Sequence, residues 1–288
     1  MCDQEMLARW GRQAMTRRGF GAGAMAAGAV ACAPVERAAE SSAAQNRSGR
    51  KVTFATPAGT MDGEFFHPAS DMYPAVILWP DIAGIRPAKR QMAQRLADEG
   101  YAVLLANPYY RDVAGQQFED FASFAANGGF DKVKPWRSKF TPATIQTDAR
   151  ACAEWLLEQP EVDTDRGIGT QGYCMTGSFA VVAPSADDHI QAGASFHGGG
   201  LVREDGPSPH TMLRADAHYL IAIAQDDDAQ APGAKTALRN AATAAGCEAE
   251  IEVYPADHGW CVPDSPAYDR EQAERAWARL LRLYSAAL

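Results

Sequence analysis

The sequence lacks any run of lysine or arginine, any C-x-x-C pair and any apolar stretch long enough to span a membrane. The formal net charge of −9 leaves no basic surface for a phosphate backbone, so nucleic acid is not an expected partner. The six cysteines have no metal-ligand spacing, so neither a zinc site nor a dense disulfide framework is predicted. The apolar segment at residues 19–33 is shorter than the ~20 residues that a membrane span needs, and it is rich in glycine and alanine.

The 288 residues, of which 47% are hydrophobic and 22% charged, fit one sizeable α/β domain, expected over residues 51–288. Residues 34–50 are polar and have no helical periodicity, which predicts a flexible linker.

Residues 1–33 resemble a twin-arginine export signal, with Arg17-Arg18, a stretch of small apolar residues and then Ala29-Val30-Ala31. Cys32 follows this tripeptide and is a candidate for lipidation, with simple cleavage after the tripeptide as the alternative. We therefore expect an exported, periplasmic protein whose only membrane contact would be a lipid anchor on Cys32. A disordered cytoplasmic tail is the alternative interpretation of the segment.

Strand and helix patterns alternate from residue 51 onwards. We expect a hairpin first, with strands at 51–56 and 63–67 and its turn near 61–63. The other expected strands are 75–79, 101–106, the segment before Cys174, 191–196, 218–224 and 250–254, and the expected helices are 88–99, 141–159, 176–183, 233–245 and 269–283. This alternation predicts a doubly wound, mostly parallel sheet with helices on both faces, in which function gathers at the carboxyl ends of the strands.

Residues 107–140 interrupt this alternation with an irregular segment rich in aromatic residues. Such an insert either covers a pocket or packs on the edge of the domain, and the sequence does not distinguish the two.

Gly167–Ala180 indicates a buried strand, a tight turn and a helix start, with Cys174 at the apex of the turn. Gly172 and Gly177 leave little side-chain bulk beside a sharp strand-to-helix turn. The helix dipole would favour a thiolate at Cys174, which is a ready nucleophile. A buried structural cysteine is the alternative.

Two further groups follow Cys174 at later strand ends: an aspartate among residues 226–228, in a segment expected to form an acidic turn over 225–228, and His258. The order nucleophile, acid, base is that of the α/β-hydrolase fold, in which histidine moves protons and the acid fixes its tautomer. Asp228 is the preferred acid and Asp227 the next choice.

The N–H groups of Met175, directly after the nucleophile, and of Ile82, after the strand at 75–79, are the expected donors to an oxyanion. His197 precedes three glycines, but an HGGG-type oxyanion loop would precede the nucleophile rather than follow it. We therefore interpret His197 as part of a pocket wall.

From residue 51 to the C-terminus, the chain resembles the dienelactone hydrolase family. The matching segments are Gly172–Cys174 with Gly177, Asp228–Pro232, Tyr254–Gly259 and Trp79–Gly84. The resemblance implies an ester or lactone hydrolase of the carboxymethylenebutenolidase type that forms an acyl-thioester on Cys174. It also implies a small-molecule substrate and neither a metal nor an organic cofactor.

The chain departs from the family pattern at two positions. The family has a glutamate that helps to activate the thiol where this chain has Asp81, and a carboxylate-binding arginine where it has Val262. Asp81 is expected to take over the activating role, directly or through a water, with a capping or turn aspartate as the alternative. Arg111 matches a second family arginine near the pocket, and Trp79 and Trp260 are expected beside the substrate. Arg111 could partly substitute for the missing arginine, whereas Trp79, Trp260 and Val262 favour an apolar ester or lactone over an anionic one.

Two other classes of function remain open from the sequence. A non-catalytic envelope-binding protein on a hydrolase fold would explain Thr176 and Asp81 as drift, and thiol redox chemistry could pair Cys261 with Cys174. A serine mechanism at Ser178 is less favoured, because that residue lies one turn inside the helix.

Overall fold

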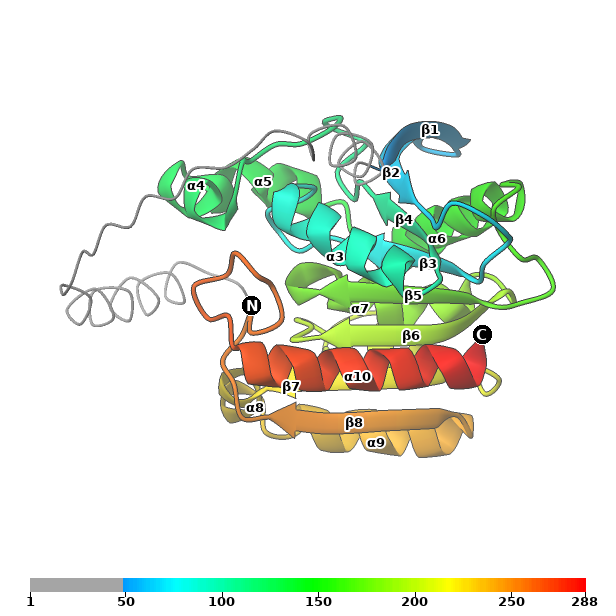
Figure 1. Ribbon diagram of the computed structural model, residues 1–288. Coiled ribbons are helices and arrows are strands. Elements are labelled where there is room, and N and C mark those ends of the chain that lie inside the picture. Colours follow the sequence, from blue (N-terminus) through cyan, green and yellow to red (C-terminus); the bar gives the residue numbers. More distant parts are fainter. Residues whose placement is uncertain (1–48) are drawn as a thin grey trace, which may run out of the picture.

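A computed structural model describes residues 49–288 of the chain (Figure 1). The export signal at 1–33, the lipidation candidate Cys32 and nearly all of the linker at 34–50 lie outside the described residues, so these assignments stay predictions. Within residues 49–288, no helix combines the length and the apolar character that crossing a membrane requires.

Eight strands of the described region form one sheet in the order β1-β2-β4-β3-β5-β6-β7-β8. β1 and β2 form an antiparallel hairpin, and β2 also runs antiparallel to β4. The six strands β3 to β8 are parallel to one another. The strands are β1 (Arg50–Thr56), β2 (Gly59–Phe66), β3 (Ala75–Trp79), β4 (Ala102–Ala106), β5 (Ile168–Tyr173), β6 (Ile190–Phe196), β7 (His218–Ala224) and β8 (Glu248–Tyr254).

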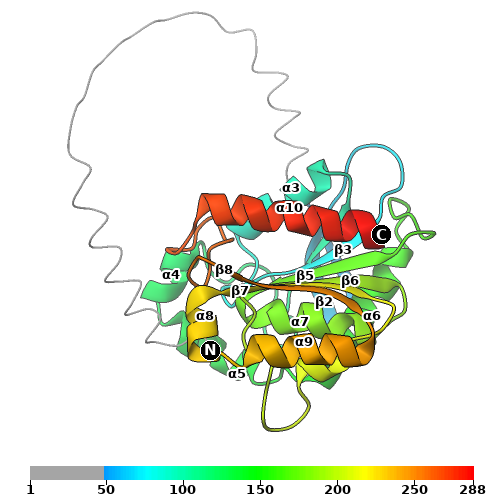
Figure 2. The same cartoon turned by 90° about the horizontal axis from the view of Figure 1, so that it is seen from below.

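Helices cover both faces of this sheet, as Figure 2 shows. α3 (Pro87–Asp98) and α10 (Arg270–Ala287) lie on one face, and α6 (Pro142–Leu157), α7 (Gly177–Val182) and α9 (Ala234–Ala245) lie on the other. Because both faces are covered, all five residues of β3 and of β4 are buried, which explains their continuous apolar sequences.

The hairpin turns earlier than the sequence predicts. The turn lies between Thr56 and Gly59, where the Thr56 hydroxyl accepts the N–H of Ala58 at 3.1 Å and Gly59 has a φ of 136°. Met61 was expected near the turn, but it is a buried strand residue whose side chain lies in the core beside α6. The register therefore pairs Thr56 with Gly59 and Phe54 with Met61.

The aromatic insert contains two short helices, α4 (Phe121–Ala126) and α5 (Gly129–Arg137), which Figure 1 shows beyond the carboxyl ends of the strands. Its side chains Phe118, Phe121 and Phe124 belong to one apolar cluster with Ile82 and Cys174. Of the two interpretations that the sequence leaves open, the structure supports an insert that covers a pocket.

Candidate active site

Cys174 occupies a strained position directly after β5. Its φ is 56°, a left-handed value, and the short 3₁₀ helix η2 (Cys174–Thr176) leads from it into α7. A Cβ on Gly172 would overlap the carbonyl oxygen of Thr176, and one on Gly177 would overlap the Cα of Gly198. Both glycines are therefore required by close backbone approach, as expected for a nucleophile elbow.

Thr176, which replaces the second glycine of the usual elbow, has a structural explanation. Its buried hydroxyl accepts the N–H of Tyr173 at 3.0 Å and lies 2.9 Å from the carbonyl oxygen of Pro80, to which it donates. The threonine thus ties the elbow to the loop after β3 that carries Ile82. The Cys174 sulfur is disulfide-bonded in the structure.

His258 lies after β8 and is paired with Asp227. Its Nδ1 lies 2.7 Å from Oδ2 of Asp227, and its backbone N–H donates to Oδ1 of Asp226 at 2.8 Å. Asp228, the acid preferred from the sequence, instead binds Nζ of Lys235 at 2.6 Å. In the structure the aspartate paired with His258 is therefore Asp227, the second choice from the sequence, and not the preferred Asp228.

The cause is the helix α8 (Gln225–Gln230), which forms where the sequence suggested an acidic turn. Successive residues of a helix are rotated by about 100°, so three consecutive aspartates point in three directions. Only Asp227 points at the imidazole ring.

Cys174 and His258 line the same cavity. Ile82, Phe121, Phe130 and Val262 give its wall an apolar character, and His197 and Asp81 also line it. The main-chain N–H of Met175 lies at the start of η2, where a helix leaves its first amides without intrahelical partners. The carbonyl of Ile82 is held by the hydroxyl of Tyr109 at 2.8 Å, which fixes the other expected oxyanion loop.

Asp81 lines this cavity, but its carboxylate is engaged elsewhere. It accepts two hydrogen bonds from Arg86, at 2.8 and 2.9 Å, and lies 2.9 Å from Nζ of Lys89. Burial alone would raise the pKa of Asp81, but the two cations outweigh it and hold the pKa well below its usual range. Asp81 is thus a permanently charged anchor of an ion cluster, and its thiol-activating role stays a prediction.

Three residues expected beside the substrate lie elsewhere. Arg111 forms two 2.7 Å hydrogen bonds with Asp148 and stacks on a tyrosine. Trp79 is a core residue whose Nε1 donates to Thr170 at 3.1 Å. Trp260 is fully buried behind His197, with a ring-centroid distance of 5.1 Å. Among the described residues, the set that lines the cavity includes none of these three side chains.

His197 contributes more than the predicted pocket wall. It lies at the end of β6, the strand next to β5, and its Nδ1 accepts the N–H of Cys174 at 3.1 Å. Burial lowers the pKa of His197 well below its usual value, and nearby His258 and Lys89 lower it further, with Asp81 opposing them. The adjacent parallel strand ends were the sequence signal that could have placed His197 beside the nucleophile.

The buried neutral state of His197 predicts a loss of stability in mild acid. The unfolded chain binds a proton near pH 6.5 that the folded ring does not bind, so the free energy of unfolding falls as the pH drops below 6.5. One such group contributes at most about 1.4 kcal/mol per pH unit. Urea unfolding of wild type and His197→Asn at pH 8, 6 and 5 is expected to show the wild type losing this much relative to the variant. A constant difference across these pH values would contradict the prediction.

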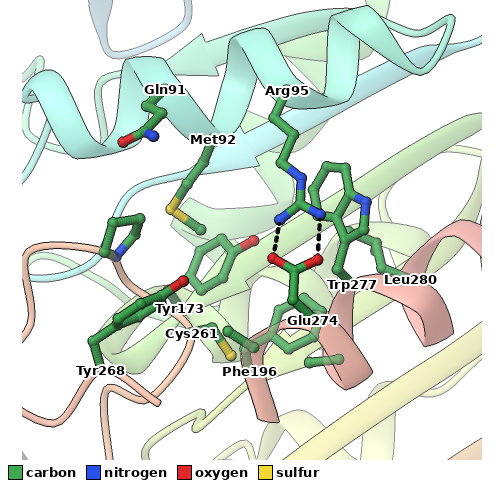
Figure 3. Close-up of a pocket in the computed structure, with 13 residues that line it drawn as sticks. Gln91, Met92, Arg95, Tyr173, Phe196, Cys261, Tyr268, Glu274, Trp277 and Leu280 are labelled. Carbon is green, nitrogen blue, oxygen red and sulfur yellow. Dashed lines mark hydrogen bonds and ion pairs between the residues drawn. The ribbon is translucent and has the colours of Figure 1, made fainter. Parts of the chain in front are cut away.

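A second cavity of about 190 Å³ lies between α3 and α10 and is lined in part by Tyr173, the last residue of β5 (Figure 3). Cys261 lines it together with Tyr268 and Trp277, and the ion pair between Arg95 and Glu274 lies at the same place. Cys261 is a free thiol, and burial raises its pKa well above the usual value. The structure therefore does not pair Cys261 with Cys174, as the redox alternative required.

A nucleophile elbow after β5, an acid after β7 and a histidine after β8, on a mostly parallel sheet covered on both faces, define an α/β-hydrolase fold. A family profile described as the dienelactone hydrolase family matches residues 61–288. The chain belongs to the dienelactone hydrolase family and is an ester or lactone hydrolase, as the sequence predicted.

Individual relatives agree with this placement. A Synechocystis protein assigned as a carboxymethylenebutenolidase is 26% identical over 225 residues, which cover 76% of this chain and 89% of the relative. The carboxymethylenebutenolidase of Pseudomonas sp. strain P51 is 24% identical over 223 residues, or 75% of this chain and 86% of the relative. A crystal structure assigned as a dienelactone hydrolase from Klebsiella pneumoniae has a TM-score of 0.69 at 23% identity, covering 82% of this chain and 98% of that one, and supports the fold.

Proposed function

We propose that the protein hydrolyses carboxylic esters or lactones through a triad of Cys174, His258 and Asp227 and an acyl-thioester on Cys174. The observation that carries the proposal is the pair between His258 and Asp227, with 2.7 Å between Nδ1 and Oδ2. His258 lines the same cavity as Cys174. In this geometry the aspartate fixes the tautomer with hydrogen on Nδ1 and leaves Nε2 to exchange protons.

The reaction divides into two acyl transfers. The Cys174 thiolate attacks the carbonyl carbon, and the C–O bond to the leaving alcohol breaks as His258 donates a proton to that oxygen. Water then attacks the thioester while His258 takes its proton, which releases the carboxylic acid and the thiolate. The N–H groups of Met175 and Ile82 are the proposed donors to the oxyanion in both steps.

An uncharged, apolar acyl group suits the described cavity. Ile82, Phe121, Phe130 and Val262 line it, and the buried cations Arg86 and Lys89 are already neutralised by Asp81 and by Asp264, which binds Arg86. Charged substrates would gain little here and lose hydration. Equal turnover of neutral and carboxylate-bearing lactones would contradict this preference.

The test of the nucleophile is intact-protein mass spectrometry. The chain is first reduced, because Cys174 is disulfide-bonded in the structure, and is then mixed with p-nitrophenyl acetate while nitrophenolate release is followed. We expect one acetyl group on Cys174 and continued turnover in the wild type. Cys174→Ala is expected to show neither, whereas Cys261→Ala, which changes the thiol of the other cavity, serves as the matched control. Equal behaviour of wild type and Cys174→Ala would overturn the proposal.

A further inference from the structure

The His197 ring has a defined tautomer. Its Nδ1 lies 3.1 Å from the backbone nitrogen of Cys174, and a backbone N–H can only donate, so Nδ1 is the unprotonated acceptor. The ring is fully buried and neutral, because burial holds its pKa far below the usual value. Its single N–H is therefore on Nε2.

This Nε2–H is a buried donor with no hydrogen-bond partner within residues 49–288. An unsatisfied buried donor costs roughly 1–3 kcal/mol, and most buried polar groups in proteins are paired. His197 is also one of the polar residues that line the cavity of Cys174 and His258. An unpaired donor on a ring that lines such a cavity is suited to an acceptor that arrives with the substrate.

The ring lies beside that of His258, which indicates the substrate atom to which that acceptor belongs. The centroids of His197 and His258 are 4.7 Å apart, with the two planes inclined at 58°. His258 delivers its proton to the leaving oxygen, so an oxygen within reach of His258 also lies beside His197. The backbone donors expected for the carbonyl oxygen come from Met175 and Ile82.

We propose that Nε2–H of His197 donates a hydrogen bond to the leaving-group oxygen of the substrate, which makes the site selective for oxygen esters and lactones over thioesters. Sulfur is a much weaker acceptor than oxygen, so a thioester leaves the donor unsatisfied. This inference rests on the proposed hydrolysis at Cys174.

The experiment compares phenyl acetate with S-phenyl thioacetate in the reduced full chain. His197→Asn retains an acceptor near Nδ1 but has no group at the Nε2 position, whereas His197→Gln places an amide N–H near Nε2. The ratio of kcat/KM for ester over thioester is the readout, because the intrinsic reactivity of the substrates cancels between variants. We expect the ratio to fall roughly 10- to 100-fold in His197→Asn and to recover in part in His197→Gln.

An unchanged ratio in His197→Asn overturns the inference. Should that variant fail to fold, ¹⁵N NMR of the histidine rings in the wild type replaces it, because a protonated Nδ1 on His197 also overturns the inference. Failure of the proposed function is seen separately, since the wild type would then gain no acetyl group on Cys174 in the mass spectrum.

Discussion

Asp227→Asn is expected to lower kcat for ester hydrolysis by roughly 10³- to 10⁴-fold. In the proposed mechanism the carboxylate of Asp227 accepts a hydrogen bond from Nδ1–H of His258, at 2.7 Å, and stabilises the imidazolium that forms during acyl transfer. An amide can present its NH₂ group to Nδ1 instead, which would favour the tautomer with hydrogen on Nε2 and leave no base for the attacking groups. Steady-state kinetics with p-nitrophenyl acetate measure the loss.

Asp228→Asn is the matched control, because it makes the same chemical change on the next residue of α8. Asp228 binds Lys235, which has 30% of its side chain exposed, so the change removes a partly solvated ion pair of little value to the fold. We expect a kcat close to that of the wild type. A large loss in Asp228→Asn with a small one in Asp227→Asn would restore the choice made from sequence.

The contrast between Asp227 and Asp228 shows which part of the site can be predicted from the sequence and which part cannot. The order of Cys174, an aspartate and His258 at successive strand ends was predictable, because parallel strands align their carboxyl ends and the chain order is typical of the fold. The particular aspartate was not predictable, because it depends on a helix of six residues in place of a turn. A single rotation of about 100° decides which carboxylate faces the imidazole.

Arg111 and Trp79 show a second limit. The sequence places both near strand ends, but their partners, Asp148 and Thr170, lie 37 and 91 residues away. Those partners hold the side chains in the scaffold rather than at the cavity. Local pattern carries no information about such distant pairs, so residue type suggested a binding role that the fold does not support.

Asp81 belongs to a buried ion cluster that joins three segments around the cavity. Arg86, fully buried on the residue before α3, binds Asp81 of the loop after β3 and Asp264 of the loop after His258, at 2.8 and 2.7 Å. Asp264 also accepts the N–H of Phe121, the first residue of α4, at 3.0 Å. Lys89 completes the cluster, so two cations balance two carboxylates.

Arg86→Met is expected to lower the free energy of unfolding by about 3–5 kcal/mol. Methionine has a similar apolar stem, so the main change is the loss of the guanidinium from two carboxylates. Asp81 would keep only Lys89, and Asp264 would lose its cationic partner while it still accepts from Phe121. The loss of one partner from a buried ion pair is costly because the remaining charge keeps its desolvation penalty. Urea unfolding at pH 7 measures the change.

The same substitution on α3, Arg95→Met, provides the control. Arg95 forms a 2.6 Å pair with Glu274, but 42% and 48% of the two side chains are exposed, so water solvates each charge when the other is removed. We expect a loss of no more than about 1 kcal/mol for this variant. Both variants exchange arginine for methionine near one helix, and both remove a cation from an aromatic ring, Phe121 for Arg86 and Trp277 for Arg95. The difference between them therefore reports mainly on burial of the charge. Equal losses in the two variants would show that the cluster around Asp81 is solvated in solution, and the anchoring of the three segments would then have to come from the apolar contacts of Ile82, Phe121 and Cys174.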